Sequence, residues 1–161
     1  MNRTLLAFVM TLAGTAALAA GQVEVSFKPV DELSDVGRGL DRERNVKALA
    51  DHFKSLAAQL PDGQRLTVEV LDVDMAGELR PMRRSDELRV MKGGADWPKL
   101  ELKWSLTAGG QTLKAGQDRL ADMAYLNHSL RGGDTRPVAY EARLIDRWFE
   151  ASVLGAKADP R

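Results

Sequence analysis

Apolar and polar residues alternate in several short stretches of the chain, and this pattern predicts strands with one buried face. The first stretch covers residues 23–27 and ends at Pro29, and a longer one covers residues 65–74. Within the longer stretch the apolar residues change phase after Val70. We therefore expect a β-bulge near Val70 and Leu71.

A helical period separates these two stretches. Apolar side chains recur at steps of three and four on one face: Val46, Leu49, Ala50, Phe53, Leu56, Ala57 and Leu60. This spacing predicts an amphipathic helix of about five turns. Asp41 is expected to be its N-cap, and residues 61–63 (Pro-Asp-Gly) end it. His52 falls on the polar side and is expected to be exposed.

The second half of the chain predicts mostly strands. Residues 76–85 are interpreted as a loop, residues 88–91 as a short strand, and residues 100–107 and 112–116 as a hairpin. A last helix has its apolar face at Tyr140, Leu144, Ile145, Trp148 and Phe149. The order of elements predicts an α+β fold, a two-layer sandwich of a mainly antiparallel sheet with both amphipathic helices on one face.

The N-terminus has the pattern of a secretory signal peptide. Arg3 precedes an uncharged apolar run, and Ala17-Leu18-Ala19 supplies the small residues that signal peptidase requires. We expect residues 1–20 to be a signal peptide cleaved near Ala19 or Ala20, and the product to be periplasmic or secreted. Residues 21–155 are then a single α+β domain, and residues 156–161 a frayed tail. No transmembrane segment is expected after cleavage.

Composition excludes several classes of protein. The 161 residues include 23 basic and 23 acidic side chains, and this balance argues against a nucleic-acid partner. The chain has no cysteine, so it forms no disulfide and is not a lipid-anchored lipoprotein. It also lacks a Gly-x-Ser-x-Gly elbow, a His-Glu-x-x-His motif and a phosphate-binding glycine loop. We therefore predict no catalytic residue from motifs.

An acidic turn is the sharpest local feature. Asp72, Asp74 and Glu78 place three carboxylates within seven residues and are candidate ligands for a divalent cation, the only cofactor considered. The segment departs from the helix-loop-helix calcium loop, because Ala76 and Arg83 stand where that loop needs oxygen ligands. The alternative is that the acids mark a strand end and a turn, where the Asp side chains bond to nearby amides and Glu78 pairs with Arg80 or Arg83.

A basic loop follows the acidic turn. Arg80, Arg83 and Arg84 are candidates for binding an anionic group, such as a lipid headgroup or a cell-wall carboxylate. Among the three tryptophans, Trp104 and Trp148 lie on apolar faces and are expected in the core. Trp97, which precedes Pro98 in a loop, is the candidate surface contact.

Several segments, taken in order, carry a resemblance to a known family. They are Asp41-Arg-Glu-Arg-Asn45, residues 66–78 with the Asp-Val-Asp-Met-Ala-Gly turn, residues 88–91 with Trp97-Pro98, residues 122–126, and Tyr140-Glu141 with Trp148-Phe149. Together they resemble the secreted proteobacterial family catalogued as domain of unknown function 3016, over nearly all of the mature chain. The resemblance implies an envelope location and a single domain, and it assigns no catalytic residue.

Our leading hypothesis is a periplasmic binding or accessory module of the cell envelope, without catalytic activity. Its partner would be an envelope protein or an anionic envelope component. The recognition edge would comprise the acidic turn (Asp72, Asp74 and Glu78), the basic loop (Arg80, Arg83 and Arg84) and Trp97. One alternative is a metal-assisted hydrolase using the acidic turn, and another is a purely structural envelope protein.

Overall fold

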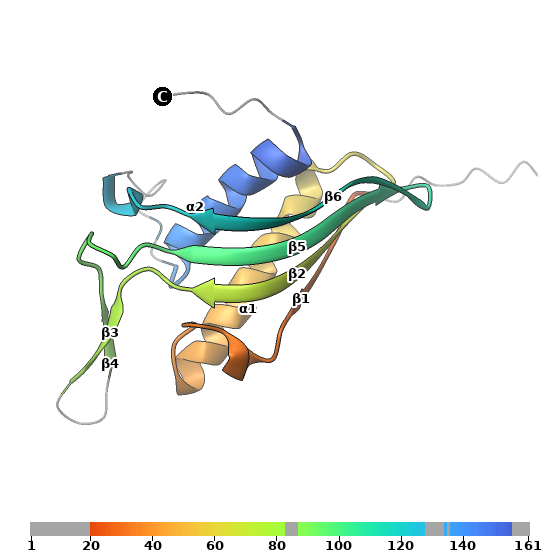
Figure 1. Cartoon of the computed structure of the whole chain (residues 1–161). Helices are drawn as coiled ribbons and strands as arrows, with labels where there is room; N and C mark the ends of the chain where they lie inside the picture. The colour runs from red at the N-terminus through yellow and green to blue at the C-terminus, as the bar shows by residue number, and fades with distance from the viewer. Residues whose placement is uncertain (1–19, 83–86, 128–133, 135, 156–161) are drawn as a thin grey trace, which may run out of the picture.

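A four-stranded sheet and two helices form the body of the protein in the computed structural model, which describes residues 20–82, 87–127, 134 and 136–155 (Figure 1). The strands are β1 (Gln22–Phe27), β2 (Gln64–Asp74), β3 (Glu78–Pro81), β4 (Glu87–Val90), β5 (Lys99–Ala108) and β6 (Gln111–Ala121). The helices are α1 (Gly39–Ser55) and α2 (Ala139–Trp148). Short helical turns are η1 (Val30–Glu32), η2 (Leu56–Gln59), η3 (Tyr125–Asn127) and the π-turn η5 (Phe149–Val153). The predicted signal segment up to residue 19 and the predicted tail, residues 156–161, lie outside the described residues.

The strand order in the main sheet is β1-β2-β5-β6. β1 and β2 are parallel, and α1 makes the crossover between them that a parallel pair requires. The other neighbours are antiparallel. The pairing of β2 with β5 shifts register between Val70 and Asp72, which confirms the predicted bulge. Gly109 and Gly110 both have positive φ and close the β5–β6 hairpin, whose second strand is longer than predicted.

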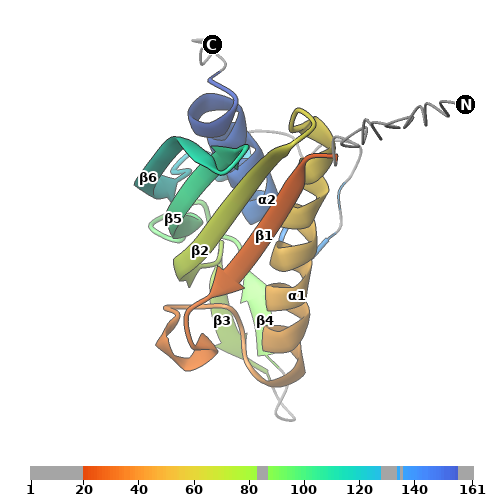
Figure 2. The ribbon, with the colours of Figure 1, turned by 90° about the vertical axis from the view of Figure 1, so that its right-hand side faces the viewer.

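Both helices pack against the same face of the sheet (Figures 1 and 2). Along β2, Leu66, Val68 and Val70 are fully buried under the helices, whereas Thr67 and Glu69 between them are exposed on the open face. This alternation is the predicted one, and it confirms the two-layer α+β sandwich. In the described part of the chain, no helix is both long and apolar enough to span a membrane.

Two tryptophans join the layers. The rings of Trp104 on β5 and Trp148 on α2 meet edge to face, with 5.7 Å between their centroids. Both indole Nε1–H groups donate to the same oxygen, Asp118 Oδ2, at 2.8 Å each. The prediction that Trp104 and Trp148 lie in the core is therefore confirmed, and Asp118 satisfies the polar atom of each.

The start of α1 differs from the prediction. The helix begins at Gly39 with Arg38 as N-cap residue, and no side chain caps it. Gly37 and Gly39 both have positive φ, and this lets the chain enter the helix earlier than Asp41. Asp41 lies inside the first turn and pairs with Arg44 at 3.1 Å. The predicted Asp41 cap is thus wrong.

The expected exposure of His52 is also wrong, because the side chain is 8% exposed. The imidazole lies between helices, with Nε2 2.8 Å from Asp146 Oδ1 on α2 and Nδ1 3.3 Å from Arg136 Nη1. A guanidinium only donates hydrogen bonds, so Nδ1 is the acceptor and Nε2 carries the proton given to Asp146. The helical period showed only the face that contacts the sheet, whereas α1 also contacts α2.

The predicted loop at residues 76–85 contains a strand instead. β3 pairs with β4 in a small antiparallel hairpin that projects from the end of the main sheet (Figure 1). Its residues are largely exposed, so no apolar alternation marked it as a strand. Gly77, at φ +82°, allows the turn into β3. A Cβ there would lie 2.9 Å from the backbone oxygen of Val90.

Candidate functional site

The three carboxylates of the acidic turn do not converge. Asp72 accepts hydrogen bonds from the backbone N–H and the hydroxyl of Ser34, at 2.8 Å each. Asp74 pairs with Lys99 at 2.7 Å. Glu78 pairs with Lys92 and lies 3.8 Å from Arg80. Among the residues that the structure describes, no group of three or more His, Cys, Asp or Glu side chains is placed to hold a metal ion.

The remaining predicted site residues are also spread out. Arg80 is exposed on β3, whereas Arg83 and Arg84 lie outside the described residues. Trp97 is half-buried, and Lys99 Nζ lies 5.7 Å from the centroid of its ring. Of the predicted recognition edge, the structure brings together Glu78 with Arg80, and Asp74 and Trp97 near the shared Lys99.

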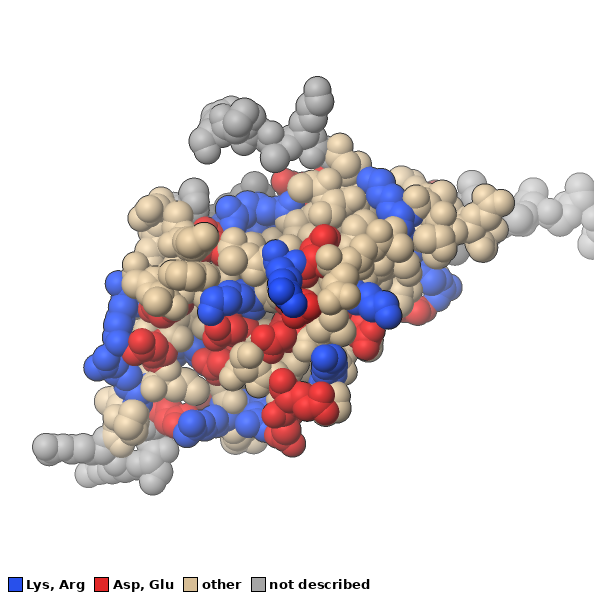
Figure 3. All heavy atoms as spheres, viewed as in Figure 1, with Lys and Arg blue, Asp and Glu red and all other residues tan. Residues whose placement is uncertain are grey.

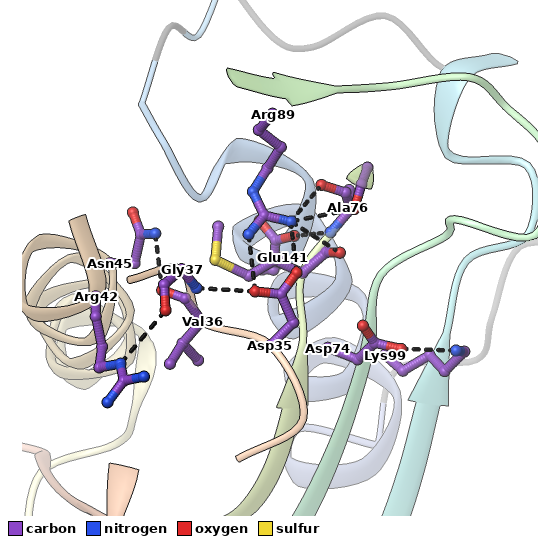
Figure 4. A network of polar contacts seen from close by, with 12 residues as sticks. Asp35, Val36, Gly37, Arg42, Asn45, Asp74, Ala76, Arg89, Lys99 and Glu141 are labelled. Atoms are coloured by element: carbon purple, nitrogen blue, oxygen red, sulfur yellow. Dashed lines mark hydrogen bonds and ion pairs between the residues drawn. The ribbon is translucent and has the colours of Figure 1, made fainter. Parts of the chain in front are cut away.

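A different pair organises this end of the molecule. Arg89 on β4 binds Asp35 through both Nη atoms at 2.9 Å each (Figure 4). The same guanidinium lies near the backbone oxygens of Ala76 and Gly77, at 3.3 and 3.1 Å. This bidentate contact fastens the β3–β4 hairpin to the segment that leads from β1 into α1.

Asp35 is held in its ionised form. Burial raises its pKa, but the hydrogen bond from Arg89 and the backbone hydrogen bond from Gly37 together bring the pKa below its ordinary value. A parallel bridge between Asp35 and Asp74 also joins the segment to the end of β2. The Asp35 carboxylate therefore binds Arg89 of β4 and the N–H of Gly37, and the Asp35 backbone binds the end of β2.

Glu141 on α2 lies close behind this pair (Figure 4). Its side chain is 1% exposed, and Oε1 accepts the backbone N–H of Ala76 at 2.8 Å. In the described part of the chain, Oε2 is buried without a hydrogen-bond partner. Burial is the main influence on Glu141 and raises its pKa.

A cleft of about 400 Å³ opens in front of Arg89, between the hairpin, the start of α1 and the segment before α2. It is lined by Gly37, Arg38, Asp41, Arg44, Asn45, Met75, Leu79, Glu87, Arg89, Met91, Arg136 and Pro137. We call it the arginine cleft, because four arginines but only two acidic residues line it. Met75, Leu79 and Met91 supply an apolar part of its wall.

The other three arginines of the cleft are ion-paired as well. Arg38 pairs with Glu87 at 2.9 Å, and Arg44 pairs with Asp41, but the Arg38 and Arg44 side chains remain 74% and 69% exposed. Arg136 binds Asp134 at 2.6 Å. Its hydrogen bonds also lower the pKa of Asp134. The guanidinium groups of Arg38 and Arg44 are exposed and their ion pairs are therefore weak, so a bound anion can replace either carboxylate partner at small cost.

Sequence reasoning missed this cleft because its arginines stand far apart in the chain, at positions 38, 44, 89 and 136. In the sequence, Arg89 follows Arg83 and Arg84 of the predicted basic loop. Arg38 and Arg44 gave one weak signal, since both stand near the expected start of the helix. Nothing local linked Arg136 to them.

Fold and cleft together define a small two-layer α+β domain with a basic cleft beside a projecting hairpin. The chain belongs to the family described as "Protein of unknown function (DUF3016)", whose family model matches residues 21–151. This confirms the resemblance noted in the sequence. No curated protein and no solved structure matches the chain.

Proposed function

We propose that this protein is a binding or accessory module of the cell envelope, without catalytic activity, and that the arginine cleft is its ligand site. The ligand is an anionic envelope component, with a carboxylate or phosphate group attached to an apolar portion. The observation that carries the proposal is the lining of the cleft, in which four guanidinium groups surround an apolar wall.

The charges of the cleft favour an anionic group. Arginine presents its donors as a planar fork, which matches the oxygens of carboxylate and phosphate. Arg89 is already occupied by Asp35, so Arg38 and Arg44 are the side chains with the most freedom to turn toward a ligand. Their exposure makes them available to it.

The apolar wall favours a ligand that is more than a bare ion. Met75 is buried beneath the cleft, Leu79 is half-buried, and Met91 is 37% exposed. Methionine side chains are flexible and polarisable, so they adapt to apolar groups of different shape. An apolar tail that displaces water from these residues would add to the affinity provided by the arginines.

The envelope location is supported by the N-terminal pattern and by the position of the family match. The match begins at residue 21, directly after the predicted cleavage site. Expression of the full chain in a Gram-negative host, followed by mass spectrometry of the periplasmic fraction, tests export. A product starting at or near residue 20 supports it, and an uncleaved chain that stays with the cells overturns it.

The ligand proposal is tested by calorimetric titration with octyl phosphate, octanoate, octanol and inorganic phosphate. We expect the two anionic amphiphiles to bind, and octanol and inorganic phosphate to bind much more weakly. Octyl phosphate and octanoate also distinguish a phosphate-bearing from a carboxylate-bearing ligand.

Arginine variants locate the binding. Arg38→Gln and Arg44→Gln should each weaken binding about tenfold, because each removes one charge-assisted hydrogen bond to the ligand. Matched controls are Arg65→Gln and Arg119→Gln, which remove arginines paired with Glu24 and Glu101 on the open face of the sheet. That face carries intermingled basic and acidic side chains (Figure 3). Equal loss in the control variants, or no binding of either amphiphile, would overturn the proposal.

A further inference from the structure

The two edges of the main sheet differ in how they are protected. β1 and β6 are the outer strands, and each presents backbone N–H and C=O groups that no neighbouring strand of the sheet pairs. On β6, the helix-side positions include Lys114 and Asp118, which lie opposite the buried residues Leu106 and Leu102. Inward-pointing charges of this kind discourage an added strand, because its apolar side chains would meet them.

β1 has no such protection. Its helix-side residues are Val23, Val25 and Phe27, which lie beside Leu66, Val68 and Val70 of β2 and are only partly buried. The backbone N–H of Lys28 donates to Val70 O. In a parallel pair, alternate residues bond to the same neighbour, so the N–H and C=O groups of Val23, Val25 and Phe27 point away from β2.

Residues of β1 and α1 line a groove with a largely apolar surface beside this open edge. The two elements are neighbours at this edge of the sheet (Figure 2). The groove has a volume of about 550 Å³ and is lined by Val25, Phe27, Val30, Asp31, Arg42, Glu43, Val46, Lys47 and Ala50. A strand added to β1 would place every second side chain over this groove. The edge therefore offers both unpaired backbone groups and an apolar surface for the added side chains.

We propose that this edge binds β1 of a second copy of the chain, antiparallel and related by a two-fold axis at Val25. In that register Val25 faces Val25 of the second copy, and Val23 faces Phe27. The outward-pointing backbone groups of Val23, Val25 and Phe27 then all form hydrogen bonds with the second copy, and the two sheets join into one. The proposal is independent of the ligand assigned to the arginine cleft.

The sequence of β1 is complementary to itself in this register. On the open face Glu24 stands opposite Ser26 and Gln22 opposite Lys28, so no like charges are paired. An axis shifted to Glu24 would oppose two carboxylates. An axis shifted to Ser26 would place Pro29, which lacks an N–H, opposite Val23. Only the register centred on Val25 uses the whole strand without either conflict.

The absence of cysteine in the chain provides a direct test of the axis. A hydrogen-bonded antiparallel pair has Cα atoms about 5.5 Å apart, within the range that a disulfide spans. The chain from residue 21 onward, which holds every element of the described fold, should therefore form a disulfide-linked dimer under mild oxidation when it carries Val25→Cys. Leu113→Cys, at a 50% exposed position on β6, is the control and should form no disulfide-linked dimer.

Charge variants test the same contact without a crosslink. Sedimentation velocity over a wide concentration range should show a monomer–dimer equilibrium for the unmodified chain. Ser26→Lys, which faces Glu24 of the second copy, should tighten the dimer roughly threefold to tenfold, and Ser26→Glu should weaken it by a similar factor. Ser105→Lys and Ser105→Glu lie on the inner strand β5 and should leave the equilibrium unchanged. Thermal melts confirm that each variant is folded.

A single monomer mass at every concentration would overturn the proposal, as would a dimer that the Ser26 variants do not alter. Crosslinking of Val25→Cys to another envelope protein, without self-crosslinking, would also overturn the proposal and would show that β1 binds a different partner. A negative result in any of these tests leaves the expected ligand titration of the arginine cleft unaffected.

Discussion

Arg89 and Asp35 lie 54 positions apart in the chain and are joined by two hydrogen bonds of 2.9 Å each. The pair is largely shielded, since the side chains are 14% and 26% exposed. It connects the β3–β4 hairpin to the segment before α1, and both of these parts line the arginine cleft. The contact therefore contributes to the width of the cleft, together with the Arg38–Glu87 ion pair between the same two parts.

Arg89→Ala should lower the free energy of unfolding by about 2–4 kcal/mol, because it leaves the Asp35 carboxylate without its main partner. Arg89→Lys keeps the charge but lacks the planar fork of donors, so it should lower the free energy of unfolding by less than Arg89→Ala does. Urea unfolding monitored by tryptophan fluorescence measures both. Arg119→Ala, at an 83% exposed side chain, is the control and should change stability by less than about 0.5 kcal/mol.

Stability should fall on the acid side partly through Asp35. Its pKa is lower in the folded state than the ordinary value of 3.8, so its contribution is complete above that value and is lost as the pH falls through the folded pKa. Asp35→Asn should be less stable at neutral pH and should lose less on acidification. Thermal melts across an acid pH series test this, and parallel curves for the two proteins would contradict it.

The contribution of Glu141 to stability should depend on pH in the opposite direction. Burial raises its pKa above the ordinary value of 4.5, so the folded state favours the protonated form, and stability is lost as the pH rises through the folded pKa. Glu141→Gln removes the buried charge and keeps an oxygen for the Ala76 N–H. It should therefore raise the melting temperature at pH 8 and lose that advantage near pH 4.

Glu141→Ala provides the complementary control. It also removes the charge, but it leaves the buried N–H of Ala76 without an acceptor, which costs about 1–3 kcal/mol. A Gln variant less stable than the unmodified protein at pH 8 would show that the ionised carboxylate is stabilising.

Divalent cations should leave the melting temperature unchanged. Asp72, Asp74 and Glu78 each bind a different partner, so a metal would have to break three separate contacts to gather them. A ligand at 100 times its dissociation constant would add about 2.7 kcal/mol, a shift of several degrees that is easily measured. A shift with magnesium or calcium that disappears in Asp72→Ala would restore the metal hypothesis.

The sequence by itself determined the class of fold. Apolar residues at steps of two and of three to four are a local consequence of burying one face of a strand or helix, so the main strands, both helices and the bulge after Val70 could be predicted. The family resemblance had the same origin, since the segments that carry it are read in order along the chain.

The tertiary structure alone decided the polar contacts. The predicted acidic turn was a cluster in sequence, but Ser34 and Lys99 reach two of its carboxylates separately from distant segments. Conversely, the four arginines of the cleft come from three segments that are distant in sequence, and the fold brings these segments to one cleft. His52 was misjudged for the same reason, because its partners Asp146 and Arg136 lie more than 80 positions away. Side-chain pairing depends on which segments the fold brings together, and no local period records that.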